Sequence, residues 1–159
     1  MFRSKVFAKI LNWLKIMPIR RMRDGAGEVL KNDETENRAI ETLRTGVPFC
    51  ILPEGTHRAK HSLLPLRKGI FRIAIRANEE FGKEKPIYIV PVGLEYGDWF
   101  NLWDNLVVNV GKPMNVTEFI AERGEMEYPK LILEMREELT KRMQELILWV
   151  PDDENYENN

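Results

Sequence analysis

FCILPEGTHR, at residues 49–58, joins an apolar run to a polar turn. The apolar residues predict a buried strand from Val47 to Leu52. The Pro-Glu-Gly turn after it holds a glycine, which lets a ligand approach the backbone closely. A carboxylate, a hydroxyl and cationic side chains lie together here, so we predict a pocket for a hydroxylated, phosphorylated ligand.

The rest of the chain alternates helical patterns with short apolar runs. We predict helices at residues 33–44, 66–81 and 128–149, and strands at residues 86–94 and 106–110. Gly46 is expected to end the first helix, and the last helix is expected to carry an apolar stripe of Leu131, Met135, Leu139, Met143 and Leu146. The run from Pro86 to Leu94 is almost continuously apolar, which is typical of a strand covered on both faces. This order predicts an α/β fold with a largely parallel sheet flanked by helices. We assign residues 1–150 to one domain and residues 151–159 to an acidic, disordered tail.

The net charge of −1 conceals a strong asymmetry along the 159 residues. Residues 1–78 hold 16 Lys/Arg and 7 Asp/Glu, a balance of +9, whereas residues 79–159 hold 8 and 18, a balance of −10. A cationic first half predicts an anionic partner, either a phosphate ligand or a lipid headgroup surface. The alternative is a solvated charged surface without a partner. The single cysteine, Cys50, indicates a reducing cytoplasm and is expected to be a small core residue.

Residues 2–16 predict an amphipathic helix with a basic polar face. Such a helix either packs on a core or lies at an anionic membrane surface, where Trp13 suits the interface. No apolar stretch reaches the ~20 residues that span a bilayer. The location expected from the sequence is therefore cytoplasmic and peripheral, at the inner face of the cell membrane.

Cations gather after the Pro-Glu-Gly turn and also earlier in the chain. Between Glu54 and Glu79 no carboxylate occurs, and the basic residues there are Arg58, Lys60, Arg67, Lys68, Arg72 and Arg76. A second cluster, Arg20, Arg21 and Arg23, follows Pro18. Arginine favours bidentate contact with phosphate. The alternative is a turn whose glutamate pairs with a nearby arginine.

The order of these motifs resembles the glycerolipid acyltransferase family, of the lysophosphatidic acid acyltransferase type. Three of its four motifs have counterparts here: Met17-Pro18-Ile19-Arg20-Arg21, Leu52-Pro53-Glu54-Gly55-Thr56 and Val90-Pro91-Val92. The resemblance covers roughly residues 1–120 and implies a fold like that of glycerol-3-phosphate acyltransferase. Leu52 stands where the family has phenylalanine, and His57 stands where it often has arginine.

The resemblance implies that Arg21, Glu54 and Gly55 bind the phosphate and glycerol hydroxyls of the acceptor. We add Thr56, His57 and Arg58 as substrate-binding residues of the same turn. Pro91 would shape the pocket and its acyl-donor side.

The family's first motif, a His-x-x-x-x-Asp dyad, has no counterpart. Ser62 and Leu66 stand five residues after His57 and His61, the two histidines, and we expect surface or phosphate-contacting roles for both. We therefore expect a chain that is truncated at its N-terminal end and has no catalytic residue of its own.

These observations lead to one main functional hypothesis and one alternative. The main hypothesis is an acyltransferase of glycerophospholipid synthesis, which moves a fatty acyl group from acyl-CoA or acyl-carrier protein to a lysophosphatidic acid-like acceptor and is inactive alone. The alternative is a non-catalytic remnant that binds phospholipid or membrane. We expect no cofactor, no metal and no nucleic-acid partner, and we expect self-association through an exposed sheet edge.

Overall fold

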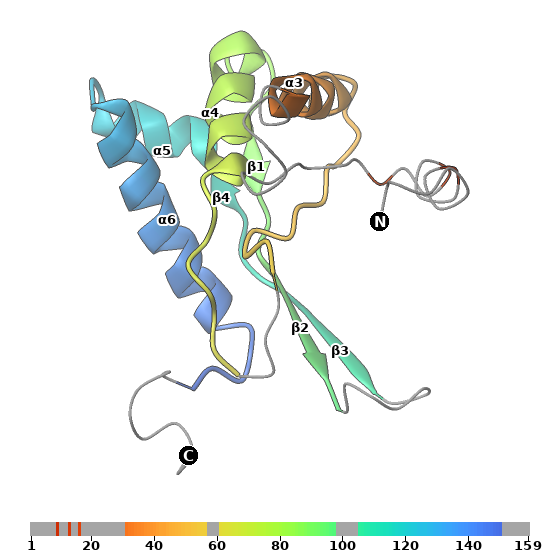
Figure 1. Ribbon diagram of the computed structural model, residues 1–159. Coiled ribbons are helices and arrows are strands. Elements are labelled where there is room, and N and C mark those ends of the chain that lie inside the picture. The colour runs from red at the N-terminus through yellow and green to blue at the C-terminus, as the bar shows by residue number, and fades with distance from the viewer. Residues whose placement is uncertain are drawn as a thin grey trace. The chain divides into compact units, whose positions relative to one another are not determined.

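The computed structural model describes residues 9, 13, 16, 31–56, 61–97 and 105–150. The chain divides into two compact units, Met1–Phe49 and Cys50–Asn159. The helices and strands are α3 (Lys31–Arg44), α4 (Gly69–Phe81), β1 (Tyr88–Ile89), β2 (Val92–Tyr96), β3 (Leu106–Val110), β4 (Met114–Asn115), α5 (Val116–Arg123) and α6 (Tyr128–Gln144), as Figure 1 shows. The predicted tail at residues 151–159 lies outside the described residues. None of the described helices is long and apolar enough to cross a membrane.

Helix α3 belongs to the first unit. Its buried apolar residues are Ala39 and Ile40. The helix ends at Arg44, and Gly46 in the turn that follows has a left-handed φ of 86°. The Gly46 amide donates to the Leu43 carbonyl at 3.0 Å, and the Val47 amide donates to the Thr42 carbonyl at 3.3 Å. These two bonds satisfy carbonyls that a helix end would otherwise leave unpaired. The prediction that Gly46 ends this helix is confirmed.

The second unit places its helices together around an apolar core. Helix α4 contacts both α5 and α6, and α5 contacts β1 and β4 (Figure 1). The Asn115 side chain caps α5 by accepting from the Glu118 amide at 3.2 Å. The largest fully buried side chains of this core are Leu66, Phe71, Met114, Val116, Met135 and Leu139. The apolar stripe predicted for the last helix is confirmed for Leu131, Met135, Leu139 and Met143, which are buried on α6, whereas Leu146 lies beyond the end of that helix.

Both strand pairs in the described residues are antiparallel. Strand β1 pairs with β4 through Tyr88–Asn115 and Ile89–Met114, and β2 pairs with β3. The predicted mixture of helices and strands is confirmed, but the largely parallel sheet is not found in the part of the chain that the structure describes. A hairpin explains the difference for β2 and β3, because parallel neighbours need a long crossover connection between them.

The prediction of a buried strand from Val47 to Leu52 is wrong. These residues form no strand, and the side chains of Val47 and Leu52 are 53% and 77% exposed. Cys50 is exposed as well, so it is not the core residue that the sequence predicts. An apolar run becomes a buried strand only when a neighbouring strand pairs with it and another layer covers it. No described residues pair with this run.

The run from Pro86 to Leu94 divides into two strands that are covered on one face. Burial alternates along it: Ile87, Ile89, Pro91 and Gly93 are buried, whereas Tyr88, Val90, Val92 and Leu94 are exposed. This period of two is that of a sheet with a single covered face. The prediction that this strand is covered on both faces is therefore wrong.

The segment after α6 covers the inner face of the β2–β3 hairpin. Helix α6 ends at Gln144, before the predicted residue 149. The Leu146 carbonyl accepts from the Asn109 side-chain amide at 2.8 Å, and the Leu148 amide donates to the Glu95 carboxylate at 2.6 Å. The helix ends early because its following residues hydrogen-bond to the hairpin.

Gly93 permits this contact, and replacing it tests the packing. A Cβ at Gly93 would stand 2.4 Å from the Leu146 carbonyl oxygen. We expect Gly93→Ala to lower the free energy of unfolding by about 1–3 kcal/mol, because backbone rather than a flexible side chain must move. Urea unfolding followed by circular dichroism measures the change.

Gly69→Ala is the matched control, because a Cβ at Gly69 meets nothing within 4 Å. At the first position of α4, alanine should leave stability unchanged or raise it by up to about 1 kcal/mol. Equal unfolding curves for the two variants would show that Gly93 is not in tight contact with the Leu146 carbonyl.

Candidate functional site

The Pro-Glu-Gly segment forms a tight turn at the start of the second unit. The Gly55 amide donates to the Leu52 carbonyl at 3.2 Å, which closes a four-residue turn. Proline suits the second position of such a turn and glycine the fourth. Gly55 also has a left-handed φ of 68°, a conformation that glycine adopts without steric cost.

Two hydrogen bonds attach this turn to the segment that follows it. The Leu64 amide donates to Oε2 of Glu54 at 2.8 Å, and the Arg67 amide donates to the Pro53 carbonyl at 2.8 Å. Glu54 is partly buried, so water competes little for its bond. Oε1 of Glu54 makes no hydrogen bond to the described residues. The carboxylate is therefore fixed at one oxygen and able to accept a further donor at the other.

Arg67 is a residue of this site that the sequence interpretation missed. Arg67 is one of six basic residues between Glu54 and Glu79, and the sequence alone does not show which of them lies at the turn. The structure places Arg67 there, because a Cβ at Gly55 would lie 3.4 Å from Cγ and 3.8 Å from Nε of Arg67. Because Gly55 has no side chain, space remains beside the exposed side chain of Arg67.

The other predicted site residues have different outcomes. Gly55 and Thr56 are exposed on the turn beside the partly buried Glu54. Pro91 is buried at the base of the hairpin, where its carbonyl accepts from the Gly111 amide at 2.9 Å. Its predicted role on the acyl-donor side stays a prediction. Arg21, His57 and Arg58 lie outside the described residues.

His61 lies in the segment that carries Leu64 and Arg67. It is exposed, in agreement with the surface position expected for it, and its carbonyl accepts from the Val150 amide at 2.6 Å. This bond connects the segment beside the turn to the end of the described chain. The turn is consequently supported from a distant part of the sequence.

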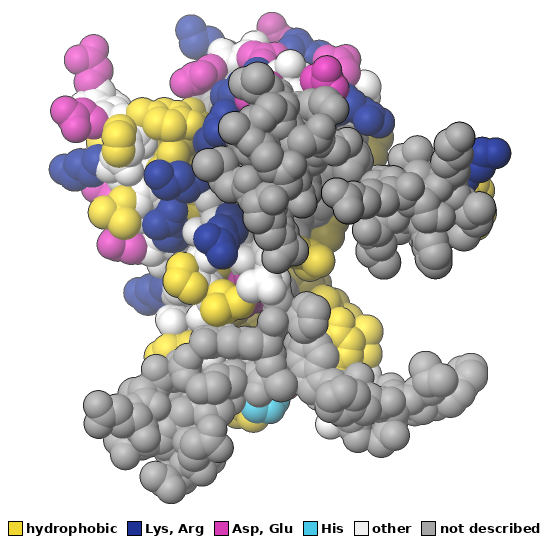
Figure 2. Space-filling model, viewed as in Figure 1, with side chains coloured by type: hydrophobic (Ala, Val, Ile, Leu, Met, Phe, Trp, Pro, Cys, Tyr) yellow, Lys and Arg dark blue, Asp and Glu magenta, His cyan; other side chains and the backbone are white. Residues whose placement is uncertain are grey.

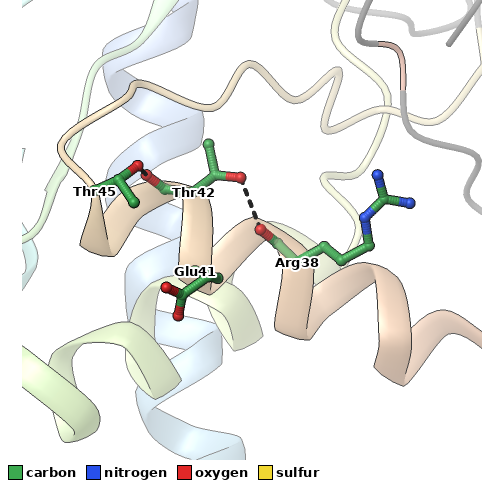
Figure 3. Close-up of a pocket in the computed structure, with 4 residues that line it drawn as sticks. All are labelled: Arg38, Glu41, Thr42 and Thr45. Atoms are coloured by element: carbon green, nitrogen blue, oxygen red, sulfur yellow. Dashed lines mark hydrogen bonds between the residues drawn. The ribbon is translucent and has the colours of Figure 1, made fainter.

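Two shallow depressions on the described surface do not contain the predicted residues. One, of about 320 Å³, is lined by Arg38, Glu41, Thr42 and Thr45, all from α3 (Figure 3). There the Thr42 hydroxyl donates to the Arg38 carbonyl at 2.8 Å. The other, of about 390 Å³, is lined by Arg123 and by residues of α6. Its main interaction is the Arg123–Glu134 ion pair at 2.7 Å, which joins α5 to α6. Polar side chains that line each depression bond to other protein groups, so neither depression identifies a ligand site.

Comparison with known families assigns the chain to a class of enzymes. The model of the acyltransferase family matches residues 1–95, which is more than half of the chain. The chain belongs to the acyltransferase family, whose members transfer acyl groups. The matched range includes the Pro-Glu-Gly turn, Arg21 and Pro91. Neither the comparison with curated proteins nor that with solved structures found a match.

Gly55 and Gly124, two of the three described glycines with a positive φ, offer a test of the turn. Alanine at either position should lower the free energy of unfolding by about 1–2 kcal/mol, because both have positive φ. Only Gly55→Ala places a methyl group beside Arg67, since a Cβ at Gly124 meets nothing within 4 Å. We therefore expect similar thermal unfolding but weaker binding of glycerol 3-phosphate by Gly55→Ala alone, measured by calorimetry. Equal binding by the two variants would show that Gly55 is not part of the ligand site.

Proposed function

We propose that this chain represents the acceptor-binding part of an acyltransferase of glycerophospholipid synthesis. The reaction transfers a fatty acyl group from acyl-CoA or acyl-carrier protein to a lysophosphatidic acid-like acceptor. The observation that carries the proposal is the Pro-Glu-Gly-Thr turn, with its fixed carboxylate and its neighbouring guanidinium, inside a sequence that matches the acyltransferase family.

The geometry of the turn supports a division of tasks among its residues. Oε1 of Glu54 accepts a hydrogen bond from a glycerol hydroxyl, while Oε2 holds the Leu64 amide. Gly55 lets the ligand approach, and the Thr56 hydroxyl is a further donor or acceptor. Arg67 joins the phosphate-binding group proposed from the sequence, Arg21, His57 and Arg58.

Acyl transfer to the acceptor hydroxyl needs a base, and the 159 residues contain no histidine followed by an aspartate at the family's spacing. Acyl transfer removes the hydroxyl proton as the oxygen attacks the thioester carbonyl, and a histidine oriented by an aspartate performs this step in the family that the sequence resembles. Neither His57 nor His61 is followed by an aspartate five residues later. The same observation favours the alternative function, a phospholipid-binding protein without catalysis.

Membrane association through residues 2–16 is part of this proposal. Lys9 and Trp13 are helical and exposed, and Trp13 is 81% exposed. In the helix that the sequence predicts for residues 2–16 they are four positions apart, which would place them on one face. An indole beside a cation on that face suits the headgroup region of an anionic bilayer at the inner face of the cell membrane.

Glu54→Gln separates the structural task of this side chain from its binding task. The glutamine carbonyl still accepts from the Leu64 amide, so the melting temperature should change little. Loss of the charged acceptor should weaken lysophosphatidic acid binding about tenfold, since bonds to charged groups are worth about 1.5–3 kcal/mol. Glu84→Gln, at an exposed position after α4, is the matched control and should bind like the unchanged chain. If both variants bind equally well, Glu54 does not contact the acceptor.

The missing dyad predicts a low rate of transfer by the 159-residue chain. With radiolabelled acyl-CoA and lysophosphatidic acid, we expect a rate ~10²–10⁴-fold below that of an acyltransferase carrying the dyad. Binding of the acceptor should persist in the same preparation. A comparable transfer rate would contradict the argument from the missing base, and its loss in His61→Ala would identify His61 as the base.

A further inference from the structure

Strand β3 is an exposed apolar edge of the second unit. Strands β2 and β3 form a two-stranded sheet, so each has one edge that is unpaired among the described residues. In Figure 1, β3 lies on the side of the hairpin away from α6, and hydrophobic side chains gather where the hairpin lies (Figure 2). Leu106, Val107, Val108 and Val110 are 50% to 67% exposed. Four of the five residues of β3 are thus apolar and open to solvent.

The register of the hairpin shows which backbone groups point to this free edge. The Gly111 amide donates to the Pro91 carbonyl at 2.9 Å, directly beside Val110. Bonded and non-bonded pairs alternate along an antiparallel ladder, so Val110, Val108 and Leu106 belong to the non-bonded pairs. Their N–H and C=O groups point away from β2. No other described strand pairs with them, so this edge is open to a further strand.

Strand β3 has none of the features that usually protect a sheet edge. Natural proteins block such edges with charged side chains, with proline or with a bulge. The sequence of β3 is Leu-Val-Val-Asn-Val, which contains no charge and no proline. Its pairing with β2 continues without a bulge from Val92–Val110 to Tyr96–Leu106. An unprotected edge of this kind binds a strand from another chain.

We propose that β3 pairs with β3 of a second copy of this chain, antiparallel and across a twofold axis at Val108. A twofold axis makes the contact self-complementary. In this register Val108 lies opposite the Val108 of the second copy, and Leu106 lies opposite its Val110. The residues whose N–H and C=O groups point to the free edge therefore meet one another, as a bonded antiparallel pair requires. Self-association through an exposed sheet edge is expected from the sequence, and β3 is the edge that the geometry supplies.

The side chains of β3 suit a second copy. None of them is charged, so two copies of the strand approach without like-charge repulsion, and the pairs across the axis join apolar side chains. The contact of two short strands is smaller than the ~800 Å² per partner of a standard interface, so we expect a weak dimer with a dissociation constant in the micromolar range. The proposal concerns an edge separate from the Pro-Glu-Gly turn and holds whatever the acyl acceptor is.

Sedimentation velocity of the full chain at low salt tests the proposal. The unchanged chain should convert from monomer to dimer as its concentration rises to about 100 µM, where a complex with a micromolar dissociation constant is mostly formed. Val108→Lys places two like charges directly opposite each other at the twofold axis. We expect about fivefold weaker dimerisation of this variant. A chain that stays monomeric throughout this range would overturn the proposal.

Mixing two variants tests the register itself. Val108→Glu should weaken dimerisation as Val108→Lys does, because two carboxylates then lie opposite each other. An equimolar mixture of the two variants should recover the dimer, since opposite charges then meet across the axis. A variant that had lost its fold would not recover on mixing. If the mixture associates no better than either variant alone, residue 108 does not lie opposite its own copy and the proposal is overturned.

Leu94→Lys is the matched control. Leu94 is paired with Val108 across the hairpin, on the same side of the sheet, and is 41% exposed. It belongs to β2, so pairing of two β3 edges leaves it one strand away from the contact. We expect Leu94→Lys to dimerise like the unchanged chain, with equal far-ultraviolet circular dichroism for all variants. Equal loss of the dimer in Leu94→Lys and Val108→Lys would overturn edge pairing and indicate two hairpins stacked face to face.

Discussion

The hydrogen bond between the Glu54 carboxylate and the Leu64 amide organises the candidate site. Together with the bond from the Arg67 amide to the Pro53 carbonyl, it holds the Pro-Glu-Gly turn against residues 64–67. Without these bonds a short exposed turn would sample many conformations, and ordering it would reduce the affinity for any ligand. The carboxylate is therefore both part of the site and one of its supports.

The support extends through the end of the described chain. The Val150 amide donates to the His61 carbonyl, and the residues just before it hydrogen-bond to Asn109 and Glu95 of the hairpin. One segment after α6 thus contacts both the hairpin and the segment beside the turn. These long-range contacts connect the family-matched part of the chain to residues beyond the match, which ends at residue 95.

Local patterns predicted helices α3, α4 and α6 and the strand β3 at residues 106–110, but they missed helix α5 and were wrong about the run at residues 47–52. Gly46 ends α3 as expected, and the stripe of α6 is buried, because both depend on residues within a turn or two of one another. The run at residues 47–52 has the same apolar character as a buried strand but has no strand partner among the described residues. Pro86 to Leu94 is apolar on both sides, although one side is exposed. Composition records how apolar a strand is, whereas burial depends on what packs against it.

The sequence by itself determined the acyltransferase family, the position of the Pro-Glu-Gly turn and the lack of a His-x-x-x-x-Asp dyad in these residues, because each depends on the identity and order of nearby residues. Tertiary structure decided that Arg67 lies beside Gly55, that Glu54 holds Leu64, and that the hairpin has one covered and one open face. Those features join residues that are distant in sequence, and their placement follows from packing and hydrogen bonding across the whole unit.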